Sequence, residues 1–231
     1  MISIIIPTFN EAGHIEELLS FLNENTQNVD TEIIIVDGGS RDNTVSIARA
    51  QGVRLLKAPQ QGRAAQMNYG ARNARGGILY FLHADTFPPK SFITDIITSL
   101  DRGYDCGCFR LMFNSSHPML RLYSWFTKFD IDYFRFGDQS LFVRKHIFKK
   151  TGFFDEQLLV MEDQEMVRKL KGEVPFIINN KAVVTSARKY KKIGAFKLQF
   201  IFTIIVILYY FNVEQKTIAH FYKETLKGSA Y

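Results

Sequence analysis

The sequence predicts an α/β fold in which helices cover both faces of a mostly parallel sheet. Short apolar runs alternate with segments of helical periodicity through the first hundred residues. Two of the apolar runs end on acidic loops: residues 33–36 lead into Asp37, and residues 78–82 lead into His83-Ala84-Asp85. Repeated strand–helix–strand units make neighbouring strands parallel, and ligands bind at the carboxyl ends of such strands. We therefore expect two carboxylates at one edge of one sheet.

In the first half of the chain, each expected element follows from its periodicity and its flanking residues. Apolar runs of strand length occupy residues 2–6, 32–36, 53–56 and 77–82. Pro7 is expected to end the first strand, Asn10-Glu11 to open the first helix, and Asp42 to cap a helix through Ala50. Further helices are predicted over residues 62–74 and from Pro88-Pro89 to about residue 100.

The second half is less regular. Strands are expected over residues 105–113, 139–143, 174–178 and 182–185, and helices over residues 144–151 and 161–171. The aromatic-rich segment 117–129 fits either a helix or a membrane-facing loop, and residues 193–226 predict one or two helices. Because no linker or repeat interrupts the chain, we expect one domain over 1–231, with halves at 1–100 and 101–190 and a helical tail at 191–231.

Composition narrows the class of partner. The chain has 231 residues and a net charge of +6, which favours nucleotides, phosphorylated lipids or a membrane surface. Nucleic acid is disfavoured because no basic run carries aromatic residues at the spacing of a known binding motif. Cys106 and Cys108 are the only cysteines, so we expect core residues in a reducing compartment and no zinc site. The N-terminus begins on a strand pattern, and no signal peptide is expected.

The tail contains an apolar run with basic residues before it. Residues 200–211 are apolar apart from Thr203, and they follow Arg188, Lys189, Lys191 and Lys192. This run is too short to span a bilayer unaided. A core helix, an interfacial helix and an oligomer contact all remain open. Together with the aromatic stretch 122–136, the run predicts either a lipid-facing surface or core and dimer packing.

Several polar segments lie where a ligand is expected, although each also has a plain structural explanation. Thr8 or Asn10 could simply cap a helix. Gly38 and Gly39 leave room for a ligand beside Asp37, but they do not form the G-x-G-x-x-G pattern of dinucleotide sites. Arg63 opens a helix, where it can reach a diphosphate or remain a solvated surface residue.

Acidic residues supply candidates for metal binding and catalysis. Asp85 would hold Mn²⁺ or Mg²⁺ beside a diphosphate, and His83 beside it also fits an ordinary strand-end histidine. Glu162 and Asp163 start a helix, where first-turn acids are common. Since adjacent helix residues point in different directions, at most one of the two faces a given site, and that one could act as a general base.

In their order and spacing, these segments resemble the family 2 nucleotide-sugar glycosyltransferases, which have the GT-A fold. The resemblance covers about residues 1–190 and rests on Pro7-Thr8-Phe9-Asn10-Glu11, Val36-Asp37-Gly38-Gly39-Ser40, Gly62-Arg63, His83-Ala84-Asp85 and Glu162-Asp163. A small bacterial subgroup, described as glycosyltransferases of arsenosugar-biosynthesis type, is the most similar. That similarity rests on Leu82-His83-Ala84-Asp85, Gly137-Asp138-Gln139, Met161-Glu162-Asp163 and Thr185-Ser186-Ala187-Arg188.

The resemblance implies a role for each matching residue. Residues 1–100 would bind the nucleotide sugar, and 101–190 would form the acceptor side. Asp163 would be the catalytic base, Glu162 would orient the acceptor or neighbouring groups, and Asp85 would bind Mn²⁺ or Mg²⁺. Asp138 and Gln139 would contact the acceptor. The donor would be bound by Pro7, Thr8, Asn10, Glu11, Asp37, Gly38, Ser40, Arg63, His83, Ala84 and Arg188. The implied reaction is a metal-dependent, inverting transfer of a sugar to an acceptor hydroxyl.

Three departures from the family pattern qualify these implications. His83 stands where the D-x-D motif has its first aspartate, which removes one anionic contact. Gly38 replaces the second acid of the common Asp-Asp-Gly-Ser segment, although Asp37 remains. The segment 186–190 lacks the Gln-x-x-Arg-Trp pattern of processive members, so a polysaccharide synthase is not expected.

Partners and rival functions follow from the same resemblance. The default donor is a UDP-sugar. A lipid-linked acceptor, a peripheral membrane contact and a homodimer are open alternatives, with the protein in the cytoplasm or at the inner face of the cell membrane. A sugar-nucleotide nucleotidyltransferase is disfavoured because residues 7–11 lack an early glycine-rich loop. A degenerate binding module is favoured by His83 and disfavoured by the intact Asp85 and Asp163.

Overall fold

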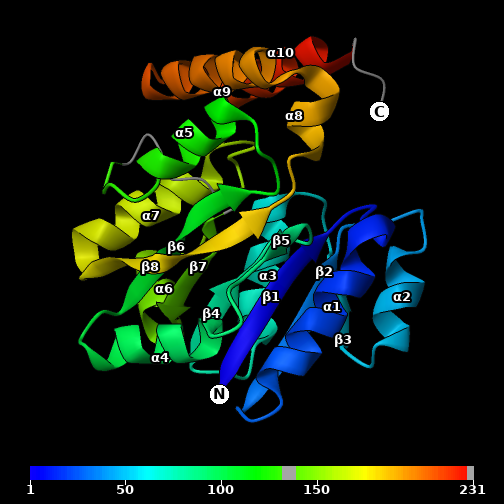
Figure 1. Cartoon of the computed structure of the whole chain (residues 1–231), viewed down its shortest axis with the longest axis vertical. Helices are drawn as coiled ribbons and strands as arrows, with labels where there is room; N and C mark the ends of the chain where they lie inside the picture. The colour runs from blue at the N-terminus through cyan, green and yellow to red at the C-terminus, as the bar shows by residue number, and fades with distance from the viewer. Residues whose placement is uncertain (132–138, 228–231) are drawn as a thin grey trace.

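The computed structural model describes residues 1–131 and 139–227 of the chain (Figure 1). Within these ranges eight strands form one sheet in the order β3-β2-β1-β4-β7-β6-β8-β5. Parallel pairing joins β3, β2, β1 and β4, and also β6 and β8, whereas β7 and β5 run antiparallel to their neighbours. The strands are β1 (Ile2–Thr8), β2 (Thr31–Asp37), β3 (Arg54–Lys57), β4 (Ile78–Phe81), β5 (Thr86–Phe87), β6 (Cys106–Phe113), β7 (Leu141–Arg144) and β8 (Phe176–Thr185). The predicted mostly parallel sheet is confirmed.

Helices lie on both faces of the sheet (Figure 1). They are α1 (Ala12–Thr26), α2 (Thr44–Ala50), α3 (Arg63–Asn73), α4 (Phe92–Asp101), α5 (Pro118–Phe126), α6 (Lys145–Thr151), α7 (Glu162–Glu173), α8 (Arg188–Ile193), α9 (Ala195–Tyr210) and α10 (Gln215–Lys227). Alternate residues of β1 enter two separate cores: Ile4 and Ile6 pack with α1, α4 and α9, whereas Ile5 packs with α3, α6 and α7. Because both faces are covered, the strands read as continuous apolar runs.

The first strand continues past Pro7, which was expected to end it. The carbonyl of Ile5 accepts a hydrogen bond from Leu82 N–H, so residues of this parity face β4. Pairing with β4 ends at Ile5, and Pro7 faces the same side two residues later. Its missing N–H therefore lies on the side of β1 where β4 no longer pairs. On the other side, β1 still pairs with β2 as far as Thr8.

Other differences from the sequence prediction are local. Asn43 rather than Asp42 is the N-cap of α2, although the Asp42 carboxylate accepts hydrogen bonds from the N–H groups of Thr44, the first helical residue, and of Ala12. The two short strands expected over 174–178 and 182–185 form one strand, β8, whose pairing register with β6 shifts once. Segment 117–129 contains the helix α5, and β5 and α8 were not predicted. Cys106 and Cys108 are buried and unbridged, as expected for core residues.

In the described part of the tail, α9 and α10 are the helices predicted over residues 193–226, and α8 precedes them above the sheet edge. Helix α9 packs against α8, α5 and α10 at the top of the view in Figure 1. Its buried stripe, which includes Leu198, Ile201 and Ile205, joins the core that contains α1 and α4. In the described part of the chain, no helix has the length and apolarity needed to cross a membrane.

Candidate active site

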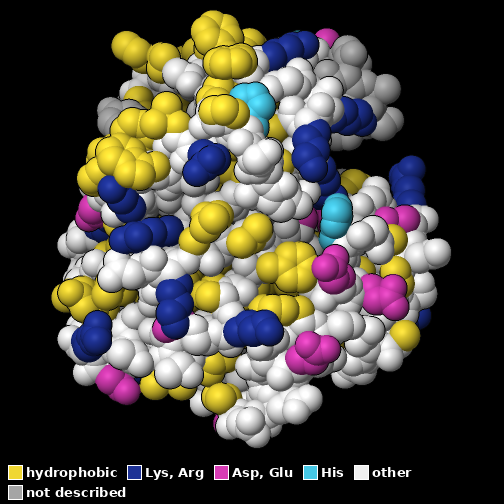
Figure 2. Space-filling view, viewed as in Figure 1, with side chains coloured by type: hydrophobic (Ala, Val, Ile, Leu, Met, Phe, Trp, Pro, Cys, Tyr) yellow, Lys and Arg dark blue, Asp and Glu magenta, His cyan; other side chains and the backbone are white. Residues whose placement is uncertain are grey.

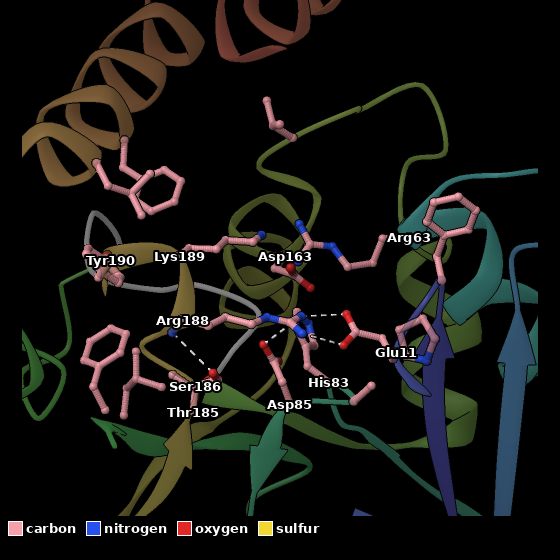
Figure 3. Close-up of a pocket in the computed structure, with 18 of the residues that line it drawn as sticks. Glu11, Arg63, His83, Asp85, Asp163, Thr185, Ser186, Arg188, Lys189 and Tyr190 are labelled. Carbon is pink, nitrogen blue, oxygen red and sulfur yellow. Dashed lines mark hydrogen bonds and ion pairs between the residues drawn. The ribbon is translucent and has the colours of Figure 1, made fainter. Parts of the chain in front are cut away.

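A cleft of about 340 Å³ opens where β1, β4 and β8 end. This is the edge at which the sequence predicted two carboxylates, and it has the size of a small-molecule site. One side of the cleft is polar and includes Glu11, Asp85, Asp163 and Arg188. The opposite side is apolar and comes from α5, α9, α10 and the end of β6. Figure 3 shows the polar group, which is contributed by segments far apart in the sequence.

Arg188 lies at the centre of the polar side. Its Nη1 and Nη2 donate to Glu11 Oε2 and Oε1 at 2.8 and 2.7 Å. The same Nη2 lies 3.2 Å from Asp85 Oδ2, so one guanidinium joins two carboxylates (Figure 3). Planar guanidinium groups favour this two-point pairing, which also fixes their orientation.

Pairing between β5 and β8 brings Asp85 and Arg188 together. Thr86 pairs with Thr185, and their hydroxyls are hydrogen bonded at 2.9 Å. One residue further along, Ser186 N–H donates to the carbonyl of Asp85 at 3.1 Å. Arg188 then begins α8 directly above this contact. Strand β5 could not be predicted, because a two-residue strand has no periodicity to detect.

The two acids at the start of α7 have separate environments. Asp163 lines the cleft, whereas Glu162 is buried beneath it and accepts a hydrogen bond from Arg63 Nε at 2.5 Å. In Figure 3, Arg63 and Lys189 extend from opposite sides toward Asp163. The bond to Glu162 ties the first residue of α3 to the first turn of α7, and it holds the Arg63 guanidinium through its Nε.

Thr8 lines the cleft and carries a buried hydroxyl that has no partner among the described residues. Thr8 is only 1% exposed, and within the described ranges its Oγ1 has no hydrogen-bond partner. A buried polar atom without a partner loses the free energy of its hydration. The backbone beside it is held by Gln66, whose Nε2 donates to the carbonyls of Thr8 and Val36 at 2.9 and 2.7 Å. Thr8 Oγ1 is therefore a candidate hydrogen-bonding group for a ligand at this wall of the cleft.

Four of the expected donor-binding residues lie outside the cleft lining and hold adjacent loops in place. The Asp37 carboxylate accepts hydrogen bonds from Gly39 N–H and from the N–H and hydroxyl of Ser40. Asn10 N–H donates to Ser40 Oγ at 2.9 Å, and its side chain accepts from Arg41 N–H. Gly38 completes this set: its N–H donates to Thr8, and a Cβ there would lie 3.0 Å from the Gln66 side chain.

The remaining predicted residues are distributed as follows. Pro7, His83 and Ala84 line the cleft beside Asp85. Gln139 is buried and is not part of the lining, and Asp138 lies outside the described residues. Sequence reasoning missed Gln66 and Lys189 as site residues. Gln66 could have been found from its position one turn after Arg63 on a helix otherwise rich in alanine.

The side chains around the cleft suit an anionic ligand that brings a cation. Arg63, Arg188 and Lys189 are three cationic groups at its wall. Among the described residues, no three His, Cys, Asp or Glu side chains are grouped to hold a metal by themselves. Asp85 nevertheless fits a divalent cation shared with a diphosphate, since such sites take one or two carboxylates and complete the shell with phosphate and water. A cation on Asp85 Oδ2 would compete with the Arg188 contact.

A mostly parallel sheet with a cleft at the carboxyl ends of its strands is typical of α/β proteins that bind small ligands. The GT-A mannosyltransferase PcManGT of Pyrobaculum calidifontis, solved with GDP-Man and Mn²⁺, matches it with a TM-score of 0.71. The two are 19% identical, and the match covers 90% of this chain and 61% of that one. The chain has the GT-A fold.

Sequence comparison identifies the family. The family model for glycosyl transferase family 2 matches residues 3–157, and the chain belongs to this family. An uncharacterized glycosyltransferase of Rickettsia typhi is 31% identical over 189 residues, which cover 72% of this chain and 57% of that protein. The dolichol-phosphate mannosyltransferase of Pyrococcus furiosus is 28% identical over 109 residues, 45% of this chain and 31% of that one. The chain therefore spans 57% of the length of the Rickettsia typhi relative and 31% of the length of the Pyrococcus furiosus relative.

Proposed function

We propose that the protein transfers a sugar from a nucleoside-diphosphate sugar to an acceptor hydroxyl. The observation that carries this proposal is a single cleft in which Arg63 and Arg188 stand beside the carboxylates of Asp85 and Asp163. A leaving diphosphate needs its charge neutralised, and an attacking hydroxyl needs a base. Residues that can meet both requirements lie in this cleft. The fold and the family of the chain are also those of glycosyl transferases.

The donor diphosphate would lie along the cationic side of the cleft. Arg63, Arg188 and Lys189 can each donate to its oxygens, and Thr8 Oγ1 supplies a hydroxyl that has no described partner. The loop held by Asp37 and Asn10 would support the nucleoside next to Thr8. A UDP-sugar remains our default donor, although PcManGT was solved with GDP-Man, so the base is a matter for direct measurement.

Asp85 would hold Mn²⁺ or Mg²⁺ together with the diphosphate. When bound, such a cation supplies positive charge to the oxygens of the leaving group. The protein's own part is to present one carboxylate at the cleft and to keep Arg188 within 3.2 Å of it. In the absence of donor, the pair with Arg188 compensates the charge of Asp85.

Asp163 would act as the base of an inverting displacement. Its carboxylate takes the proton of the acceptor hydroxyl while the hydroxyl oxygen forms a bond to the anomeric carbon. The bond from that carbon to the diphosphate oxygen breaks on the opposite side, and the electron pair leaves with the nucleoside diphosphate. One such step inverts the anomeric configuration. Buried Glu162 would keep Arg63 in position through the bond at 2.5 Å.

The apolar side of the cleft indicates the kind of acceptor. Leu198, Phe202 and Ile205 of α9 line it together with Tyr123 and Tyr222. Such a wall suits a hydroxyl carried on an apolar body better than a free sugar, which would leave its own hydroxyls without partners. We therefore propose a lipid-linked acceptor at the inner face of the cell membrane. The relative from Pyrococcus furiosus, named as a dolichol-phosphate mannosyltransferase, is consistent with this acceptor class.

The reaction is tested by identifying what the protein releases from each donor. We expect slow, Mn²⁺-dependent release of a nucleoside diphosphate and free sugar when water replaces the acceptor. A nucleotidyltransferase would instead form a sugar nucleotide and pyrophosphate from a sugar phosphate and a nucleoside triphosphate. Absence of any product from either set of substrates, despite nucleotide binding, would favour a degenerate binding module. Asp101→Asn, on the exposed end of α4, serves as a control variant.

A further inference from the structure

The outward face of α9 is apolar, which is unusual for a helix at the protein surface. Phe196, Phe200 and Ile207 are spaced by one or two turns and are 75%, 67% and 48% exposed. Phe211 follows the helix and is 79% exposed. Because the opposite stripe of α9 is buried in the core, the helix is apolar on both sides. A surface helix normally presents polar residues on its outer face, so this face is expected to have a cover.

Helix α5 extends the same apolar surface. Leu122 and Trp125 are 57% and 50% exposed on α5, which packs against α9. The His117 ring, at the N-cap of α5, lies 6.1 Å from the ring of Phe196 and joins the two helices. Figure 2 shows hydrophobic side chains gathered at the top and upper left of the molecule, where Figure 1 places α9 and α5. We call the exposed apolar residues of α5 and α9, with Phe211, the apical surface.

The charged side chains of α5, α8 and α9 all have one sign. Residues 186–213 contain Arg188, Lys189, Lys191, Lys192 and Lys197 and no aspartate or glutamate. Residues 106–129, which include α5, likewise contain no acid, and Lys128 lies over the ring of Trp125 at 4.0 Å. Acids return only at Asp130 and Glu214, where the two segments end. Exposed aromatic rings within a cationic border match the chemistry of an anionic lipid surface.

We infer that the apical surface docks the protein onto an anionic lipid bilayer. The outer face of α9 would lie in the plane of the interface, with its phenylalanine rings among the acyl chains and the lysines at the headgroups. Helix α9 has 16 residues and is therefore about 24 Å long, short of the roughly 30 Å hydrocarbon core, so it lies on the bilayer rather than across it. A second copy of the chain is a poorer cover, because two such surfaces would place like charges together.

This docking has a direct geometrical consequence for the cleft. The inner face of α9 forms part of the apolar cleft wall through Leu198, Phe202 and Ile205. One helix would therefore meet the bilayer on its outer side and the candidate acceptor space on its inner side. The lipid surface itself is inferred from exposure and charge, and it does not depend on which donor the protein uses.

Vesicle sedimentation tests the inference. The intact protein is mixed with vesicles of phosphatidylcholine alone, or of phosphatidylcholine and phosphatidylglycerol in equal parts. We expect sedimentation with the anionic vesicles, weakening as salt is added because the charges are screened. The double variant Phe196→Ser, Phe200→Ser should lower the partition coefficient by about tenfold or more, since two aromatic side chains leave the acyl region. Lys191→Gln with Lys192→Gln should weaken binding to anionic vesicles only.

Matched controls keep the result specific. Ile97→Ser alters an exposed apolar residue on α4, away from the apical surface, and Lys149→Gln with Lys150→Gln removes the same charge from α6. Both controls should sediment like the unaltered protein, and all variants should keep its melting temperature. Equal sedimentation of the Phe196/Phe200 variant and the parent protein would overturn the inference. So would a dimer in solution that the same variant dissociates, because a second copy would then cover the surface.

Discussion

Arg188 and Glu11 form a two-point ion pair, with N–O distances of 2.8 and 2.7 Å, although 177 positions separate them in the sequence. The pair joins the start of α8 to the loop between β1 and α1 on the polar side of the cleft. Arg188 also reaches Asp85, so the C-terminal helices are connected directly to the candidate donor site. A substitution in α8 should therefore alter donor binding, and a change at the donor site should alter the stability of the C-terminal helices.

A double-mutant cycle measures this connection. Glu11→Gln and Arg188→Met should each lower the free energy of unfolding, and the double variant should lose less than the sum of the two. Because the side chains of Arg188 and Glu11 are 38% and 18% exposed, solvent screening limits the coupling to about 1 kcal/mol. Urea denaturation of the four proteins gives the value. Strict additivity would show that the pair contributes nothing to stability.

Asp163→Asn should abolish most turnover while leaving donor binding nearly intact. The amide keeps the shape of the carboxylate but cannot take the acceptor proton. General-base catalysis contributes about 10²–10⁴-fold, so the rate should fall by about that factor. Steady-state turnover and donor affinity by calorimetry are compared with those of Asp101→Asn. Turnover equal to that of the parent protein would exclude Asp163 as the base.

Thr8→Val should separate ligand binding from stability. The Thr8 hydroxyl is buried and has no described partner, so an isosteric methyl should leave the free energy of unfolding unchanged or slightly raised. Donor affinity should fall, because the variant loses a hydrogen bond to the ligand. Thr86→Val is the matched control, since its hydroxyl bonds Thr185 and its loss should cost about 1 kcal/mol of stability. Unchanged donor affinity in Thr8→Val would remove Thr8 from the site.

Glu32 should make stability depend on pH at the far end of the sheet. Partial burial opposes ionisation, but hydrogen bonds from Ser3, Arg75 N–H, Arg54 and Gly76 N–H outweigh it and hold the Glu32 pKa below its ordinary value of 4.5. A pKa lowered by folding contributes stability above the unfolded value, and that stability is lost as pH falls through the folded value.

Glu32→Gln should therefore be less stable than the parent near neutral pH, by on the order of 1 kcal/mol. The difference between the two proteins should shrink as the pH drops below about 4.5. Chemical denaturation at a series of pH values measures it, with the exposed Glu24→Gln on α1 as the control. A difference that does not change with pH would show that the Glu32 charge is not what stabilises this region.

Much of the fold could be predicted because apolar periodicity marks buried strands and helices directly. The strands β2 and β4, which lead to Asp37 and toward Asp85, and the helices α2 and α4 that come later were predicted from that pattern. The extension of β1 through Pro7 could not be predicted, since it depends on where the pairing with β4 stops. The strand β5 and the helix α8 were missed because they are short and are defined by tertiary pairing.

The candidate site was predicted less completely than the fold. The sequence indicated the acids and Arg63. It could not show that the Asp37 carboxylate accepts hydrogen bonds from Gly39 and Ser40 of its own loop. Nor could it show that Lys189 enters the cleft. The direction of a side chain at the start of a loop or helix depends on contacts with distant segments. Those contacts cannot be predicted from the local sequence.

We expect a nucleoside-diphosphate sugar and a divalent cation to bind together at Asp85. The most direct measurement is thermal unfolding of the protein with UDP-, GDP-, CDP- and dTDP-sugars, each with and without Mn²⁺, alongside Asp85→Asn. We predict that one nucleotide class raises the melting temperature only with Mn²⁺, as mass action requires for a ligand that binds the folded state, and that Asp85→Asn loses the increase. An equal increase in both proteins, or the same increase without Mn²⁺, would exclude a donor site that is completed by a cation on Asp85.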